Sequence, residues 1–136
     1  MDIKIVLPDM IVAGWSRYSH YIQLALDKGQ QESTIVDQLR DLLNYNSQLW
    51  EIRDDTDDLK GIVLTRFLNY AQHKTLQVVL LSGNEFFEWI HLEEVIVKFA
   101  KDNGCVALES WGRPGWSKVL KDRGYNTVYH VLRKPI

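Results

Sequence analysis

The chain opens on an alternation of apolar and polar residues that gives way to helical spacing. Residues 3–7 alternate and predict a short strand, which Pro8 ends. From about Met10 to Lys28 the apolar residues recur every three to four positions, and Gly29 is a good stop for a helix. We therefore expect one helix after the first strand, with Gly14 weakening its first turn.

A second helix has a clearer beginning. Thr34 can cap it, and Asp37 three residues later completes a capping box, in which each residue accepts a hydrogen bond from the other's backbone. Five apolar residues then form one stripe, so we expect this helix to run to about Asn44. The stripe consists of Ile35, Val36, Leu39, Leu42 and Leu43.

Strand patterning returns near residue 49. Residues 49–53 and 59–70 flank the polar run Asp54–Asp58, which predicts a hairpin. The run lacks the internal Gly and closing Glu of a calcium loop, so we interpret it as a solvated turn. Residues 75–81 are almost continuously apolar and predict a central strand covered on both faces.

The next segment contains a second capping-box pattern. Ser82 and Glu85 have the spacing of a helix start, and apolar residues at helical spacing follow as far as Lys101. The sequence Asp102-Asn103-Gly104 favours the end of this helix. We therefore expect a long helix from about residue 85 to residue 101.

The last part of the chain alternates strand and helix. Residues 105–110 predict a strand, residues 114–122 a short helix stopped by Gly124, and residues 125–132 a final strand. The whole order is β-α-α-β-β-β-α-β-α-β without repeats or a linker. This order predicts a mixed α/β (α+β) protein with a single domain over residues 1–136.

Composition narrows the classes of partner. With 136 residues, 46 % of them hydrophobic, and a net charge of −2, the chain lacks the basic block expected for nucleic-acid binding. A lone cysteine, Cys105, and the absence of a leader or a long apolar run lead us to expect a cytoplasmic protein that does not cross a membrane. No metal site is expected, because the histidines lack ligand spacing. They are His20, His73, His91 and His130.

Two fragments carry a family resemblance. Asp58-Leu59-Lys60-Gly61-Ile62 resembles the acidic turn and Gly-bearing strand of the GCN5-related N-acetyltransferases (GNAT). Leu120-Lys121-Asp122-Arg123-Gly124-Tyr125 resembles the end of their terminal helix. The resemblance covers nearly the whole chain and implies a GNAT-like mixed sheet with a strand-helix-strand-helix-strand unit.

The resemblance also directs attention to residues 82–88, where the family holds the acyl-CoA pyrophosphate on backbone N–H groups at a helix start. Gly83 and Asn84 are the candidates for cofactor binding there. The turn has one Gly where the family has two, no basic residue, and two carboxylates, Glu85 and Glu88, that would repel an anion. These features favour a chain that binds no cofactor.

The second family signature is also incomplete. Arg113 stands where the family has Asn, and Leu120 stands where it has a Tyr that protonates the leaving thiolate. Leucine cannot donate a proton. Arg113 remains a candidate for phosphate contact, while Glu109 and Tyr125 are weak candidates for a base and a hydroxyl donor, each also interpretable as an ordinary strand residue. The sequence thus favours a non-catalytic protein over an enzyme, and both hypotheses stay open.

Residues 111–116 predict an interface. Trp111, Arg113 and Trp116 combine rigid aromatic area with a planar cation, a composition enriched where proteins contact each other. Together with the following helix, this stretch is similar to small GNAT-like proteins encoded by tailed bacteriophages, some of which occur in virions. The partners implied are other virion proteins, and the implied location is the virion after synthesis in the cytoplasm.

Two hypotheses of function follow from the resemblance. A third hypothesis is that the chain is an unrelated small α/β protein. In the main one, the chain is a non-catalytic GNAT-like component of a larger assembly, such as a phage head, head-tail junction or internal protein. The alternative is a divergent N-acetyltransferase that uses acetyl-CoA. The gap between the strands at residues 75–81 and 105–110 discriminates the two hypotheses. In an enzyme this gap must be open to admit the pantetheine arm of the cofactor. In a non-catalytic protein we expect a side chain such as Phe86 or Trp111 to fill the gap.

Overall fold

A computed structural model describes residues 1–29, 32–85, 88, 90–111 and 114–136, without the side chains of residues 114–116. Its helices and strands, in chain order, are β1 (Asp2–Val6), α1 (Pro8–Ala13), α2 (Trp15–Leu26), α3 (Ile35–Leu43), β2 (Gln48–Arg53), β3 (Leu59–Asn69), β4 (Lys74–Gly83), the 3-10 helix η1 (Ile90–Leu92), α5 (Glu93–Asp102), β5 (Ala107–Ser110) and α6 (Pro114–Lys121).

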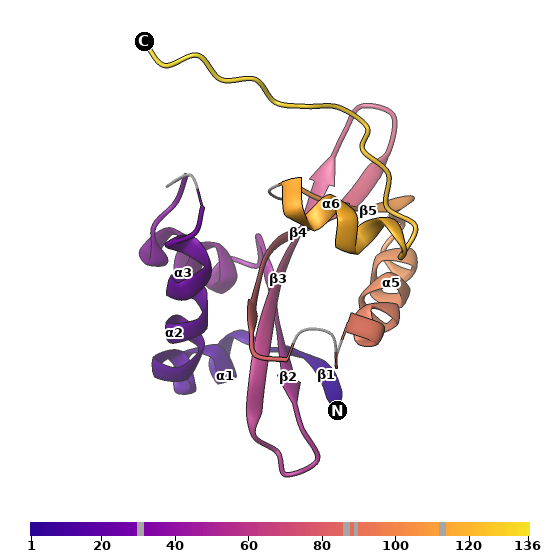
Figure 1. The fold of residues 1–136 in the computed structure, drawn as a ribbon. Helices are drawn as coiled ribbons and strands as arrows, with labels where there is room; N and C mark the ends of the chain where they lie inside the picture. The colour runs from indigo at the N-terminus through magenta and orange to yellow at the C-terminus, as the bar shows by residue number, and fades with distance from the viewer. Residues whose placement is uncertain (30–31, 86–87, 89, 112–113) are drawn as a thin grey trace.

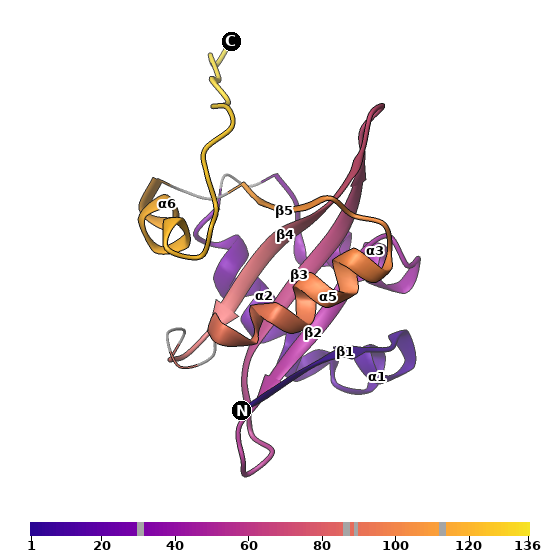
Figure 2. The ribbon, with the colours of Figure 1, turned by 90° about the vertical axis from the view of Figure 1, so that its right-hand side faces the viewer.

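The five strands form one mixed sheet in the order β1-β2-β3-β4-β5. The first four are antiparallel neighbours, and β5 pairs with β4 in parallel. Helices α1, α2 and α3 cover one face of the sheet and α5 covers the other, while α6 lies beside the β4–β5 end (Figures 1 and 2). A parallel pair requires a crossover, which the segment containing α5 provides.

Two apolar clusters fill the space on either side of the sheet, because successive strand residues point to opposite faces. In β3, Ile62 and Leu64 pack under α1–α3, whereas Val63 packs under α5. Trp50 of β2 joins the α5 cluster and donates an indole hydrogen bond of 2.9 Å to Thr65 Oγ1, so its polar atom is satisfied inside the core. The alternation predicted for these strands is confirmed.

The predicted first helix is divided in two at Gly14. A Cβ at this position would lie 2.7 Å from Tyr18 Cε2, so the ring of Tyr18 packs where a larger residue would stand. The Tyr18 hydroxyl then donates to Glu51 Oε2 at 2.7 Å, which links α2 to β2. The glycine therefore separates α1 from α2 instead of only weakening one helix.

The capping box at α3 is confirmed. Asp37 donates its backbone N–H to Thr34 Oγ1 at 3.2 Å, and Thr34 donates its own N–H to Asp37 Oδ2 at 2.8 Å. The helix ends at Leu43, one residue before the predicted end, with Asn44 as its C-cap.

The second predicted capping box is wrong. Ser82 is a buried residue of β4 paired with Ile62, and Glu85 has a left-handed backbone with φ +59°. Helix α5 begins at Glu93, after a cap residue, Leu92, that has no side-chain cap hydrogen bond. Because Ser82 still pairs with β3, it belongs to a strand and cannot cap a helix. The Ser-x-x-Glu spacing alone therefore does not place a helix start.

The final strand predicted for residues 125–132 is also wrong as a member of the sheet. The chain turns at Gly124, with φ +91°, and then runs as an extended segment away from α6 (Figure 1). Among the described residues, no strand pairs with residues 125–132. Their alternating pattern favours extended backbone, but pairing also needs a neighbouring strand.

In the described part of the chain, no helix is both long and apolar enough to cross a membrane.

Candidate functional site

The parallel pair β4 and β5 separates part-way along its length. The two strands pair at four positions, from Thr75 opposite Ala107 to Val78 opposite Ser110. Strand β4 continues to Gly83, whereas β5 ends at Ser110. The second half of β4 therefore has no β5 residue beside it within the described structure.

A β-bulge lies at the point of separation. Leu80 pairs with Leu64 of β3 while Val78 pairs with the next β3 residue, Thr65, so Val79 is an extra residue in β4. A bulge bends its strand and re-aims the side chains after it. The bend begins one residue after the last pair with β5, Val78–Ser110, and accounts for the divergence of the two strands.

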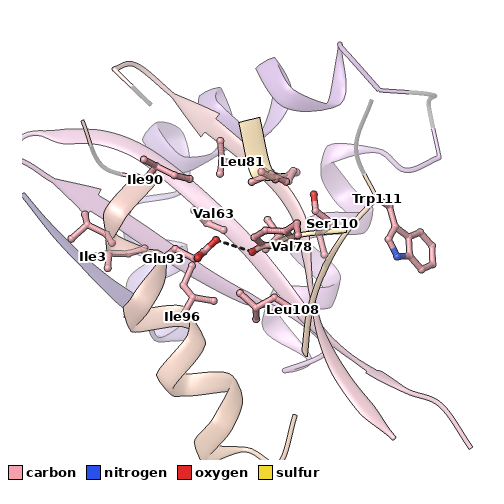
Figure 3. Close-up of a pocket in the computed structure, with 15 residues that line it drawn as sticks. Ile3, Val63, Val78, Leu81, Ile90, Glu93, Ile96, Leu108, Ser110 and Trp111 are labelled. Atoms are coloured by element: carbon pink, nitrogen blue, oxygen red, sulfur yellow. Dashed lines mark hydrogen bonds between the residues drawn. The ribbon is translucent and has the colours of Figure 1, made fainter. Parts of the chain in front are cut away.

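A cleft opens where the strands diverge, between the sheet, the start of α5 and the end of α6 (Figure 3). Its cavity volume is about 130 Å³, smaller than the roughly 300–1,000 Å³ of sites for whole drug-sized ligands. The space suits a narrow chain. Its apolar walls include Ile3, Val63, Val78, Val79, Leu80, Leu81, Ile90, Leu92, Ile96, Leu108 and Leu120, with Trp111 at one side.

The apolar run of β4 forms one wall of this cleft. The sequence predicts that residues 78–81 are covered on both faces, but in the structure all four are only half-buried. The divergence of β5 leaves them open to the cleft. The prediction of an interior strand holds, since β4 lies between β3 and β5, while the prediction of full coverage is wrong for this half of the strand.

The polar groups of the cleft come mainly from one pair. The Tyr125 hydroxyl donates a hydrogen bond of 2.8 Å to Glu93 Oε2, and both residues line the cleft. Arg123 reaches Glu93 Oε1 at 3.4 Å from the same side, and its buried Nε has no partner among the described residues. Burial, and then the hydrogen bond to Glu93, raise the pKa of Tyr125, so its hydroxyl keeps its proton at neutral pH.

Sequence reasoning did not single out Glu93. It falls in the middle of the helix predicted for residues 85–101, where an acidic residue carries no special meaning. The available signal was the adjacent pair Glu93-Glu94, because acidic residues are favoured in the first turn of a helix and α5 begins there. Tyr125 was a candidate, and the structure brings it to Glu93.

The turn proposed for phosphates is built differently from a helix start. A Cβ on Gly83 would lie 2.5 Å from both Gly61 Cα and the Lys60 carbonyl oxygen, so glycine is required by the close approach of β3. The backbone N–H of Asn84 donates to the Lys60 carbonyl at 3.0 Å, which removes it as a free donor for an anion. Glu85 and Glu88 are exposed beside this turn.

Glu109 lies on the opposite face of β5 from the cleft. Its neighbours Leu108 and Ser110 line the cleft, and side chains alternate along a strand. Glu109 Oε2 accepts hydrogen bonds from the Tyr70 hydroxyl at 2.9 Å and from Trp111 Nε1 at 3.1 Å. The candidate base thus points to the other face of the sheet and does not line the cleft.

The predicted interface residues are only partly described. Trp111 is 58 % exposed, and it lines the cleft without closing it. Arg113 and Phe86 lie outside the described residues, as does the side chain of Trp116. The assignment of Trp111, Arg113 and Trp116 to an interface stays a prediction, as does phosphate contact by Arg113.

Leu120 occupies the position at which the resemblance implies a hydroxyl. It is half-buried on α6 and lines the cleft together with Tyr125. The tyrosine five residues later supplies a hydroxyl to the same space, so the absence of a tyrosine at position 120 does not remove a proton donor from the cleft.

No group of three or more His, Cys, Asp or Glu side chains suited to a metal ion occurs in the described part of the chain. The acidic run is a turn: Asp54 Oδ1 accepts hydrogen bonds from the backbone N–H groups of Thr56 and Asp58 at 2.9 and 3.0 Å. These bonds and the Thr56 hydroxyl lower the pKa of Asp54 to about 2. The interpretation of this run as a hairpin turn is confirmed.

No family model matches the sequence, and no curated protein matches it. Solved structures match over the full length. A probable acetyltransferase has a TM-score of 0.74 at 14 % identity, with 100 % of this chain and 98 % of that chain covered. AAC(6')-Iy, in complex with the bisubstrate analog CoA-S-monomethyl-acetylneamine, has a TM-score of 0.73 at 13 % identity, covering 99 % and 97 %.

A third match is the ribosomal-protein-alanine N-acetyltransferase of Brucella melitensis biovar Abortus 2308, with a TM-score of 0.71, 12 % identity and 100 % of both chains covered. The more specific resemblance to phage proteins, and the virion partners and location that go with it, stay predictions. At these identities the likeness establishes the fold and not the activity. The chain has the fold of the GCN5-related N-acetyltransferases.

Proposed function

We propose that this protein is an N-acyltransferase that uses acetyl-CoA or a related acyl-CoA, the alternative of the two hypotheses drawn from the sequence. The observation that carries the proposal is the open cleft at the divergence of β4 and β5, with the Tyr125–Glu93 pair inside it. Trp111 lines this gap and is 58 % exposed, while Phe86, the other residue that could plug it, lies outside the described residues. The structural neighbours named above are acetyltransferases, which supports the same proposal.

The cleft has the properties that a pantetheine arm needs. The arm is a narrow chain with two amide groups, and residues 79–83 of β4 present backbone donors and acceptors toward the space that β5 leaves. Apolar side chains of β4, α5 and α6 enclose the rest of the path. An extended ligand can therefore take the place of a strand beside β4.

The proposed reaction is acyl transfer to an amine. The amine nitrogen bonds to the acyl carbon, the bond from that carbon to sulfur breaks, and the coenzyme leaves as a thiolate. The proton lost by the amine passes to a carboxylate or to water, and the thiolate is neutralised by a proton. Tyr125 is the protonated hydroxyl of the cleft, and Glu93 holds it in place before the reaction. Its single proton can be donated to the developing thiolate when the hydroxyl turns from the Glu93 carboxylate to the sulfur.

The phosphate end of the coenzyme has weaker support. Asn84 has already used its backbone N–H, and the exposed Glu85 and Glu88 add negative charge to the same turn. We therefore expect the pantetheine arm to provide most of the affinity. An acyl-pantetheine without the nucleotide should bind nearly as well as the complete acyl-CoA, whereas an enzyme with a strong phosphate site would lose most of its affinity.

The decisive experiment measures binding and turnover together. Thermal unfolding is followed with acetyl-CoA and with S-acetyl-pantetheine, and release of the free thiol is followed in the presence of a panel of amines. Ligand at 100 times its dissociation constant adds about 2.7 kcal/mol to the stability of the folded state, which raises the melting temperature measurably. Stabilisation together with amine-dependent thiol release is the expected result.

A cleft-filling variant and a matched control make the result specific. Leu120→Trp places an indole in the cleft, whereas Val106→Trp adds the same ring at a position that is 70 % exposed and does not line the cleft. Only the first should abolish ligand stabilisation. Stabilisation without thiol release would favour the non-catalytic hypothesis, and no stabilisation by either ligand would overturn the proposal.

A further inference from the structure

The outer edge of β5 is open. This strand is the last in the sheet order, and within the described residues its partner is β4 alone. Ala107, at its start, and the preceding Val106 are both exposed. An unpaired edge presents a row of backbone donors and acceptors that can hydrogen-bond to another strand.

The chain also contains an unpaired segment with strand character, residues 126–132. Its sequence, Asn-Thr-Val-Tyr-His-Val-Leu, is rich in β-branched and aromatic residues. It runs away from the body of the protein after α6 (Figures 1 and 2). Within the described structure, the backbone hydrogen bonds outside helices and strands end at Tyr125.

Apolar side chains of this segment are unusually exposed. Val128 is 79 % exposed, Val131 76 % and Leu132 92 %. The segment is held by contacts between exposed polar side chains, such as Arg133 Nη1 to Glu32 Oε1 at 2.8 Å. Contacts of this kind contribute little to stability, whereas burial of Val and Leu side chains in an interface is favourable.

We propose that residues 126–132 of one copy of this chain add as a strand to the open edge of β5 in a second copy, and that the second copy does the same in return. Each chain carries both the segment that adds and the β5 edge that receives it. Two reciprocal additions therefore form a closed twofold dimer in which both segments and both edges are paired. Among the described residues, the chain's own segment forms no ladder with its own β5. Its contact there is through side chains, because the Tyr129 hydroxyl lies beside Tyr70, which donates to Glu109 of β5.

Charge does not oppose this pairing. Residues 126–132 contain no acidic residue that would repel Glu109 of β5, and the basic residues Arg133 and Lys134 follow them. Pro135 lacks an N–H, so the added strand ends before it. The proposal does not rest on acyl transfer, and the β5 edge can pair whether or not the cleft binds a ligand.

The first test is the mass in solution, measured by light scattering over a range of concentrations. The full chain should have twice the mass of one chain. A chain ending at Tyr125 should be monomeric with an unchanged circular dichroism spectrum, whereas the matched control ending at Arg133 should remain dimeric. Val131→Pro, which removes one N–H from the segment and no contact seen in the structure, should also give monomers.

The second test asks which segments touch. In a Cys105→Ser background, chains with Val106→Cys are mixed with chains with Val128→Cys and treated with a short bismaleimide. Cross-linking between the two kinds of chain is expected, together with slowed hydrogen exchange at residues 107–110 and 126–132. A monomer, a dimer that survives the truncation, or cross-links only between Val128→Cys chains would each overturn the proposal.

Discussion

Tyr125 and Glu93 lie 32 residues apart in the sequence, yet the hydroxyl of the first donates a 2.8 Å hydrogen bond to the carboxylate of the second. The bond joins the turn after α6 to the first residue of α5. Because both residues line the cleft at the divergence of β4 and β5, this contact links α5 to the turn after α6 and places a protonated hydroxyl inside the cleft.

The first prediction concerns the role of that hydroxyl in acyl transfer. Tyr125→Phe keeps the ring but removes the donor, so the turnover number should fall at least about 100-fold, the usual range for loss of acid catalysis. The Michaelis constant for acyl-CoA should change much less. Tyr129→Phe, in the exposed C-terminal segment, is the control and should retain full turnover; equal rates for both variants would exclude Tyr125 from the reaction.

A second prediction concerns stability at alkaline pH. Burial raises the pKa of Tyr125 above its ordinary value of 10.0, so the folded state holds this proton more tightly than the unfolded state does. The stabilisation is therefore complete below about pH 10 and is lost as the pH rises toward the folded pKa.

Melting temperatures of the wild type and Tyr125→Phe at several pH values from about 8 to 11 check this sign. The wild type should lose more stability than the variant over this interval. Tyr18, whose pKa is also raised, chiefly by burial, is present in both proteins and cancels in the comparison. Parallel curves would show that Tyr125 does not titrate differently in the two states.

A third prediction separates steric contact from backbone strain at Gly83. Gly83→Ala would place a Cβ 2.5 Å from Gly61 Cα, so overpacking should cost roughly 1–3 kcal/mol in addition to the strain at φ +154°. Gly104→Ala has the strain, at φ +79°, but no atom within 4 Å of the new Cβ. Urea unfolding should give the larger loss for Gly83→Ala, and equal losses would mean that β3 and β4 move apart there at no cost.

Local patterns in the sequence predicted local structure well. The alternation of residues 49–53 and 59–70 placed β2 and β3, and the Thr34–Asp37 box placed the start of α3, because these signals depend on neighbouring residues alone. The same box pattern failed at Ser82, where pairing with β3 decided the outcome. The two cases look alike in sequence and differ only in what lies beside them in space.

The cleft was harder to predict for the same reason. Its position depends on the bulge at Val79 and on the early end of β5, and neither leaves a mark in a run of four apolar residues. The family resemblance supplied the fold and the idea of a gap between the strands. It also directed attention to Leu120 and the Ser82–Glu88 turn, whereas the carboxylate that shares the cleft with Tyr125 is that of Glu93.

The last prediction compares two leucines that are equally apolar but differently placed. Leu76 is completely buried in β4 under α5, so Leu76→Ala should leave a cavity and cost about 2–5 kcal/mol. Leu120 is half-buried and already faces open space, so Leu120→Ala should cost less than about 2 kcal/mol.

The same substitution should also change the choice of acyl group. In the cleft the smaller side chain leaves more room, so longer acyl groups should become better substrates relative to acetyl. Chemical denaturation of both variants and relative rates with acetyl-CoA and hexanoyl-CoA measure the two effects. A cost for Leu120→Ala as large as that for Leu76→Ala would mean that α6 packs tightly on the sheet and that the cleft is closed in solution.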